Sequence, residues 1–272
     1  MTTGRGVPPE AIYLYDDPDA AGLDVDYLGH WLAERLPDIP IHTRSDFLTF
    51  QLGRLGDLEQ ATRVERLQHE LAAAEVSDLV HPADRDRLPA EAPADRGWDV
   101  VYEGAALQSV LAALIPAEEA GDGAVHIVFT VCYLGEWPAD RSLLRLRVFV
   151  AGRPHLVSIS SLVEGLDLPR QYHFMRQQMA VLGMGDRLDD LAEQFSDQAL
   201  GYGDARLNEV LKGLALQAVF RQLTGDVGCS SPRCRLHTPA SHQQALRTQA
   251  RSRPGLCARH SAILRSWGGV PE

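Results

Sequence analysis

The sequence has no apolar run that approaches the roughly 20 residues needed for a membrane-spanning helix. Its first residues also lack the apolar core of a secretory signal. Apolar residues still make up 45% of the 272-residue chain and charged residues 23%, a balance typical of a globular protein with a hydrophobic core. These absences argue against a membrane protein and predict a cytoplasmic one.

Short motifs of several enzyme classes are missing as well. The chain contains no G-x-G-x-x-G or G-x4-G-K-[ST] phosphate loop and no G-x-S-x-G nucleophile elbow. No two histidines stand four residues apart, the spacing by which one helix presents two imidazoles to a zinc ion. The common nucleotide-binding loops and the usual zinc-peptidase helix are therefore excluded.

Negative charge dominates the chain, with a net charge of -11, but it is unevenly spread. Between Leu200 and Glu272, ten Lys and Arg residues stand against four Asp and Glu residues. Such an acidic body disfavours non-specific nucleic-acid binding, although a basic C-terminal tip can contact phosphate or an acidic partner. The simpler interpretation is a solvated helix face that is rich in arginine.

Hydrophobic periodicity predicts alternating strands and helices early in the chain and mainly helices later. The predicted strands are 11–15, 39–42, 98–102, 124–132, 144–150 and 155–160. The predicted helices are 25–36, 58–74, 105–115, 171–182, 188–200 and 205–223. The continuous apolar run at 124–132 is typical of a central strand buried on both faces, and the polar stretch 82–97 is predicted to be a surface loop. The pattern indicates an α/β fold with a mixed sheet and a helical C-terminal end.

The clearest chemical signal comes from the cysteines. Cys229 and Cys234 form a C-x4-C pair, and Cys257 with His260 forms a C-x2-H pair after 22 intervening residues. In a reducing cytosol, clustered cysteines indicate a metal more than disulfides, and four such ligands complete a closed zinc tetrahedron. We therefore predict one structural Zn²⁺ held by these four residues.

The fourth ligand has rivals. Cys257 and His260 fit the first turn of a helix, where residues three apart share a face, so His260 is the economical choice. His237 and His242 are alternatives. The zinc would staple residues 226–265 as a subregion of a single domain spanning 1–272. Cys132 stands apart in an apolar segment and is predicted to be a small core residue.

The segment up to the cysteines resembles the archaemetzincins. Members of that family carry H-E-x-x-H-x-x-G-x-x-H, whose histidines bind a catalytic zinc, followed by C-x4-C and later C-x-x-C, whose cysteines bind a structural zinc. In this chain Gly225 stands at the family glycine, but Ala218, Gln222 and Gly228 hold the three histidine positions and Val219 holds the glutamate position. The resemblance implies an active-site helix whose catalytic zinc ligands are lost.

A second resemblance involves His126–Thr130, Leu134–Trp137, Arg145–Val150 and Ser158–Glu164, which are similar to a poorly characterised prokaryotic group of metallopeptidase-like proteins. Together the two resemblances cover roughly residues 97–265. They imply a metzincin-like fold: a mixed twisted sheet with flanking helices, a counterpart of the active-site helix at 205–224, and a zinc-bound helical C-terminal part.

Three hypotheses follow for function, and whether the protein is an enzyme stays open. The first is a metallopeptidase-like protein that keeps only its structural zinc and binds a peptide or protein. The second is an active metallohydrolase with ligands elsewhere, among His126, His155, His173, Glu164 and Glu193. The third is a zinc-module interaction protein that uses a basic tip formed by Arg233, Arg235, Arg247, Arg251 and Arg253.

Overall fold

The computed structural model describes residues 8–76, 100–138, 144–164, 170–184, 187–195, 200–225, 228–237, 246–251 and 255–271. Its strands are β1 (Ala11–Tyr15), β2 (Ile41–Arg44), β3 (Val101–Glu103), β4 (Ala124–Thr130), β5 (Tyr133–Glu136), β6 (Arg145–Arg147), β7 (Phe149–Val150) and β8 (His155–Ser158). Its α-helices are α1 (Val25–Arg35), α2 (Phe47–Leu52), α3 (Asp57–Ala74), α5 (Gly104–Ala112), α6 (Ile159–Glu164), α7 (Arg170–Val181), α8 (Leu188–Gln194), α9 (Leu207–Thr224) and α11 (Ala258–Ser266). Two short helical turns are η1 (Ala117–Glu119) and η3 (Arg247–Arg251).

The main sheet has five strands in the order β2-β1-β4-β8-β7. The first four are parallel, with Ile12 opposite Ile41 and Val125, and β7 pairs antiparallel with β8 at the edge. A smaller sheet has the order β3-β5-β6, again with one parallel and one antiparallel pairing. The mixed α/β fold is thereby confirmed.

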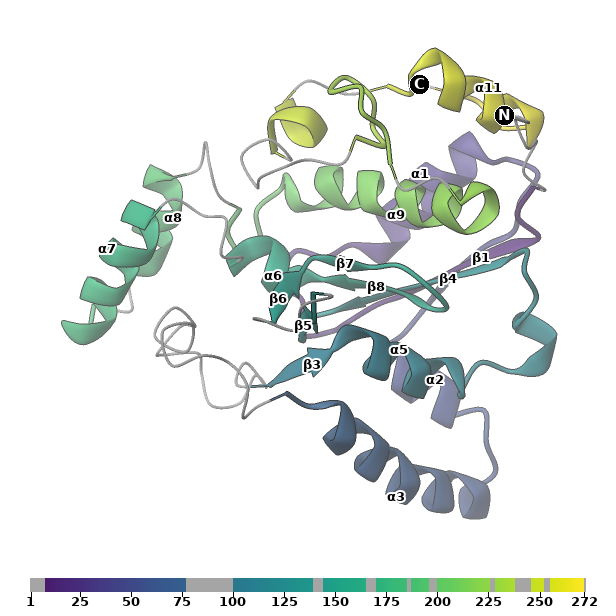
Figure 1. The fold of residues 1–272 in the computed structure, drawn as a ribbon, viewed down its shortest axis with the longest axis horizontal. Helices are drawn as coiled ribbons and strands as arrows, with labels where there is room; N and C mark the ends of the chain where they lie inside the picture. The colour runs from purple at the N-terminus through teal and green to yellow at the C-terminus, as the bar shows by residue number, and fades with distance from the viewer. Residues whose placement is uncertain are drawn as a thin grey trace.

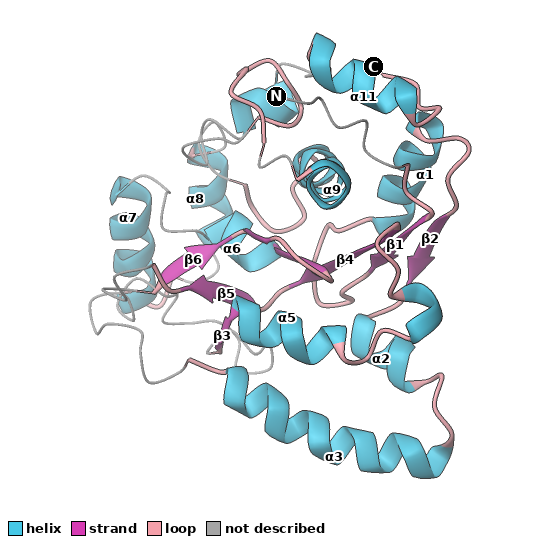
Figure 2. Ribbon diagram, turned by 45° about the vertical axis from the view of Figure 1, so that its right-hand side comes forward, coloured by secondary structure: helices cyan, strands magenta, loops and turns pink. Residues whose placement is uncertain are grey.

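Helices cover both faces of the main sheet (Figure 1). Because side chains alternate along a strand, Ile12 and Leu14 of β1 pack in the core shared with α1 and α9, whereas Tyr15 packs in the core shared with α2 and α5. Helix α3 lies outside α5, away from the sheet. Figure 2, in which α9 is seen nearly end-on, shows α9 between the sheet and α11, so the C-terminal segment forms an additional layer on that face.

Several helix boundaries are set by side-chain caps. The carboxylate of Asp24 accepts a hydrogen bond from the Tyr27 N–H at the start of α1, and Asp46 and Glu103 do the same for α2 and α5. Helix α9 ends at Gly225, whose φ of 70° lies in the left-handed region that glycine adopts without strain. The predicted end of the 205–223 helix therefore holds to within one residue.

Other boundaries differ from the predictions. The predicted strand 144–150 is divided between β6 in the small sheet and β7 in the main sheet, and the strand at 155–160 becomes helical at Ile159. The strand predicted at 39–42 lies two residues later, and the helix predicted at 188–200 ends at Gln194. The predicted loop at 82–97 falls outside the described residues. In the described part of the chain, no helix is both long enough and apolar enough to cross a membrane.

Candidate metal centre

The first half of the centre is a tight loop from Cys229 to His237. The Cys229 N–H donates to the carbonyl of Leu236 at 2.7 Å, and the His237 N–H donates to the carbonyl of Cys234 at 2.8 Å. These two bonds close the loop on itself and bring the side chains of Cys229 and Cys234 to one side. The Ser231 N–H also points at the sulfur of Cys229, 3.4 Å away.

The second half is the start of α11. Cys257 occupies the N-cap position and His260 lies in the first turn, as the C-x2-H spacing predicts. The two halves are joined through the backbone, because the Arg235 N–H donates to the Gly255 carbonyl at 2.9 Å. The Cys257 N–H points at the sulfur of Cys234 at 3.4 Å, which links the halves again at the centre itself.

The structure brings the four predicted residues together, with all four ligand atoms within 4.8 Å of one another. The Sγ atoms of Cys229 and Cys257 are 3.9 Å apart, and His260 Nδ1 lies 3.5 Å from Cys234 Sγ and 3.1 Å from Cys257 Sγ. A zinc tetrahedron requires about 3.8 Å between two sulfurs and about 3.5 Å between a sulfur and a nitrogen. The donor set and its dimensions therefore fit a closed zinc site.

Burial differs among the thiols. It raises the pKa of Cys234 to about 12, since that side chain is fully enclosed. Burial also acts to raise the pKa of Cys257, but hydrogen bonds from the backbone and imidazole of His260 outweigh it and lower the pKa to about 7. Because metals bind thiolates, ion binding at this centre has to release at least the proton of Cys234 at neutral pH.

His237 lies outside the set of converging ligand atoms. Its Nδ1 donates to the carbonyl of Cys229 at 2.8 Å, and Nε2 has no hydrogen-bond partner in the described part of the chain. The geometry therefore favours His260 over His237 as the fourth donor, with His237 bracing the Cys229 loop. His242, the other rival, lies outside the described residues.

The centre is anchored on α9 and α1. The ring of Phe220 on α9 meets His260 edge-on at 5.5 Å between centroids and also packs against Trp267. Arg235, only 4% exposed, lies over the ring of Trp31 on α1. The Cys229–His237 loop and α11 are thus packed against the main core. Arg235, one of the five arginines predicted to form a basic surface tip, is buried.

Helix α9 and the residues just after it hold the positions at which the archaemetzincin resemblance places catalytic residues. Ala218 and Val219 are fully buried in the main core, so their side chains face packed apolar groups. Gly228 has a φ of 128°, a conformation that L side chains rarely adopt. Histidine at 228 would be strained, so this backbone does not suit a ligand there.

Gln222, at the middle histidine position, is committed to the backbone. Its Nε2 donates to the carbonyls of Asp122 and Ala124 at 2.9 and 2.8 Å and ties the end of α9 to the start of β4. The Oε1 atom of Gln222 is buried and makes no hydrogen bond of normal geometry. The same is true of Nε2 of His155, a residue that is 2% exposed. The two groups nevertheless interact: burial lowers the pKa of His155 to about 4, and Gln222 opposes that shift. Gln222 therefore acts as a clamp: its amide links the end of α9 to the start of β4 by hydrogen bonds.

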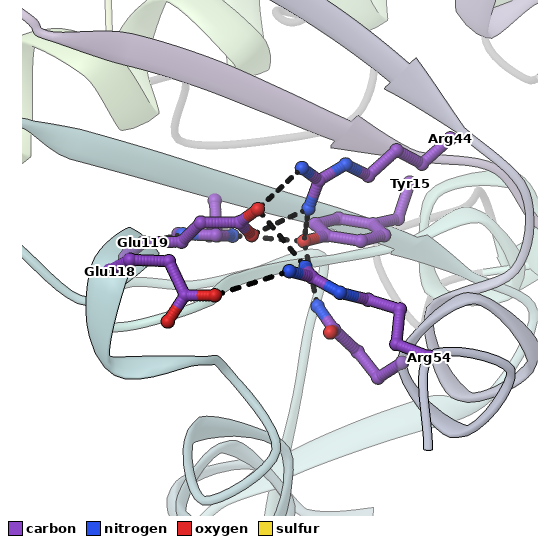
Figure 3. Close-up of polar contacts among 7 residues, drawn as sticks. Tyr15, Arg44, Arg54, Glu118 and Glu119 are labelled. Atoms are coloured by element: carbon purple, nitrogen blue, oxygen red, sulfur yellow. Dashed lines mark hydrogen bonds and ion pairs between the residues drawn. The ribbon is translucent and has the colours of Figure 1, made fainter. Parts of the chain in front are cut away.

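His126 takes part in a second polar cluster on the opposite face of the sheet. Arg44 and Arg54 reach Glu119 from two sides, and Arg44 also donates to the Tyr15 hydroxyl at 2.8 Å (Figure 3). That hydroxyl lies 3.0 Å from His126 Nδ1, while His126 Nε2 donates to the Glu119 carbonyl. Hydrogen bonding to Arg44 lowers the pKa of Glu119 to about 2 despite its partial burial. Both nitrogens of His126 are engaged, which leaves none for a metal.

Of the remaining side chains, Glu193 is exposed on α8, and Ser158 and Cys132 lie near the carboxyl end of β4. Ser158 Oγ donates to the carbonyl of Cys132 and accepts from the Ser161 N–H, so it caps α6. Cys132 is partly exposed at the end of β4, in contrast to the predicted core position. The side chains of His173 and Glu164 lie outside the described part. Within that part, the cysteine–histidine set is the one group of three or more metal-binding side chains with converging donor atoms.

Sequence reasoning missed one cavity, of about 480 Å³, at the carboxyl ends of β1 and β2. Three carboxylates line it, those of Asp16, Asp24 and Asp26. All three already have partners: Asp24 caps α1, Asp26 accepts a hydrogen bond from Thr43 Oγ1 at 2.6 Å, and Asp16 accepts one from the Asp17 N–H at 2.9 Å. The cavity is remote from the cysteines in sequence and is lined by none of them.

Residues 8–267 match the model of the family described as "Probable metallopeptidase family (DUF6775)". No curated protein and no solved structure matches the chain.

Proposed function

The chain belongs to this metallopeptidase family, and on that premise we propose that it is a member with a structural zinc site and without a catalytic one. Cys229, Cys234, Cys257 and His260 would hold one Zn²⁺. The ion would supply a four-ligand cross-link with no open position for water. One observation carries the proposal: these four donor atoms converge, while the three positions at which archaemetzincins have catalytic-zinc histidines hold Ala218, Gln222 and Gly228.

The loss of catalysis is supported by more than missing side chains. A peptidase zinc needs about three protein ligands, an open position and, as a rule, a carboxylate base. Ala218 and Val219 face packed core, Gly228 has a backbone conformation unfavourable to histidine, and the Gln222 amide is held by two carbonyls. None of these four positions therefore offers a free ligand or a base to a catalytic zinc.

In this proposal the protein acts by binding a peptide or protein and not by hydrolysing one. Residues 1–272 would form a single domain, with 226–265 as its zinc-stapled subregion, close to the archaemetzincins in the spacing of Gly225, Cys229 and Cys234. The packing of Phe220 against His260 and Trp267 supports one continuous core. Three thiolates free of disulfides fit a reducing compartment such as the cytosol.

The competing functions have less support. The proposed metallohydrolase ligands His126 and His155 are buried on different strands, and His126 has both ring nitrogens engaged. For a basic interaction tip, Arg235 is buried, although Arg233 and Arg259 are exposed. Salt-dependent binding to a nucleic acid would favour this third hypothesis.

Metal analysis of the purified protein tests the proposal. We expect one zinc per chain in the wild type, none in Cys229→Ser, and one in Cys132→Ser, which removes the cysteine outside the centre. We also expect no cleavage of casein or of a peptide library. Two zinc ions per chain, or cleavage that a chelator abolishes, would show that a catalytic centre persists.

A further inference from the structure

The four donors of the metal centre differ in their access to solvent. Cys234 is fully buried and His260 is 1% exposed, whereas Cys229 and Cys257 are both partly exposed. The Sγ atoms of these two partly exposed residues are also neighbours, 3.9 Å apart. The centre therefore has a protected half and an accessible edge formed by one cysteine from each of its two segments.

We propose that Cys229 and Cys257 form an oxidant-sensitive edge, at which hydrogen peroxide produces a disulfide and the centre loses its metal. This inference rests on the proposed structural zinc site. Cys229 and Cys257 are the two donors of the set that are partly open to solvent, whereas the surrounding protein encloses Cys234. The accessible pair, and not the buried thiol, is then the site of oxidation.

The chemistry balances with peroxide as the only co-reactant. The thiolate of one cysteine attacks a peroxide oxygen and becomes a sulfenic acid, releasing hydroxide. The second thiolate attacks that sulfur, which forms the S–S bond and releases a second hydroxide. Two electrons pass from the sulfurs to the peroxide, and two protons from solvent convert the hydroxides to water. The sulfurs have to approach from 3.9 Å to the roughly 2.05 Å of a disulfide.

The bond changes what the remaining side chains can hold. Once Cys229 and Cys257 are joined, only Cys234 and His260 remain as donors, which is too few for a closed zinc site. The new bond links the same two segments that the four donors bring together, the Cys229 loop and the start of α11. The C-terminal layer therefore stays attached to α9 through the disulfide while the metal is lost, and a reductant reverses the change.

The test starts from zinc-loaded protein treated with hydrogen peroxide. Released zinc is followed with a zinc-binding dye, and disulfides are mapped by mass spectrometry of unreduced peptides. We expect one zinc released for each Cys229–Cys257 disulfide, with Cys234 still alkylated as a free thiol after the metal has gone. Dithiothreitol and added zinc should restore the metal content, and Cys132→Ser should behave like the wild type.

A second variant isolates the pair. Cys257→His keeps four donors but cannot form the disulfide, so its peroxide-driven release of zinc should be lost. Retention of zinc by the wild type under peroxide, or a disulfide that contains Cys234, overturns this inference and leaves the zinc site intact. Absence of zinc from the untreated protein overturns the zinc site and this inference together.

Discussion

At the scale of single residues, His155 makes stability depend on pH. Burial lowers its pKa to about 4, whereas an unfolded histidine titrates near 6.5. Between these pH values the unfolded chain binds the proton more readily. The folded state therefore has its full stability above pH 6.5 and loses about 3 kcal/mol from this residue as the pH falls to below 4.

The variant His155→Gln removes that titration. We expect a flatter dependence of the free energy of unfolding on pH between 6.5 and 4, measured by urea denaturation across that range. His30→Gln, at an exposed position of α1, serves as the matched control and should keep the wild-type slope. The other titratable groups are shared by His155→Gln and the wild type, so the difference between their slopes isolates His155. An unchanged slope in His155→Gln would contradict the assignment.

The two arginines around Glu119 should differ sharply in their contributions to stability. The Arg44 side chain is 10% exposed and lies over the rings of Tyr13 and Phe50, whereas Arg54 is 34% exposed. Arg44→Ala leaves the enclosed Glu119 carboxylate with a weaker partner and should cost about 3 kcal/mol. Arg54→Ala breaks a more solvated pair and should cost about 1 kcal/mol or less. Equal costs in chemical denaturation would show that the cluster is not organised around Arg44.

At the scale of secondary-structure elements, Gln222 holds the end of α9 to the start of β4. Gln222→Ala removes two hydrogen bonds, one to the exposed Asp122 carbonyl and one to the partly buried Ala124 carbonyl, and should lower the free energy of unfolding by about 2 kcal/mol. Gln222→Glu has no amide donor and adds a charge, so it should be more destabilising at pH 7. Gln178→Ala, at an exposed position of α7, should change stability by less than about 0.5 kcal/mol. A neutral result for both Gln222 variants would mean that other contacts fix this end of α9.

Elements with local signals were predictable from the sequence. The apolar run 124–132 produced β4, buried at six of its seven positions, and the C-x2-H spacing placed Cys257 and His260 on one helical turn. Each of these signals depends on residues close together in the chain. Helix α9, predicted over 205–223, likewise spans Leu207–Thr224.

Features that join distant residues were not predictable in the same way. The bend at Val148, which divides 144–150 between two sheets, depends on where β5 and β8 lie and not on its own alternating pattern. The Gln222 clamp and the Arg44–Glu119 pair likewise connect residues that no local motif relates. Sequence alone therefore located the four side chains that converge at the candidate metal centre, but not the contacts that hold Gln222 and Arg44.

At the scale of the whole molecule, the metal should stabilise the C-terminal layer selectively. Structural zinc contributes on the order of 10 kcal/mol to the folding of the segments that bind it. A chelator should therefore increase amide hydrogen exchange in residues 228–237 and 255–271, while β1 and β4 stay protected. Fluorescence should change as well, because Trp31 and Trp267 both pack near the centre. Added zinc should reverse both effects, and a uniform loss of protection across the sheet would contradict a local role.

The pairing of β1 with β4 also affects how the chain reaches its native state. β1 finds its second neighbour only after more than a hundred further residues, across α1 to η1. Such non-local pairing makes folding slow, on the order of milliseconds to seconds, because chain entropy is lost before the contacts form. During synthesis, a nascent chain that has emerged only as far as α3 leaves the β4 side of β1 unpaired and the side chains of Ile12 and Leu14 without their cover from α9. An unpaired strand edge and uncovered apolar side chains of this kind are prone to aggregation.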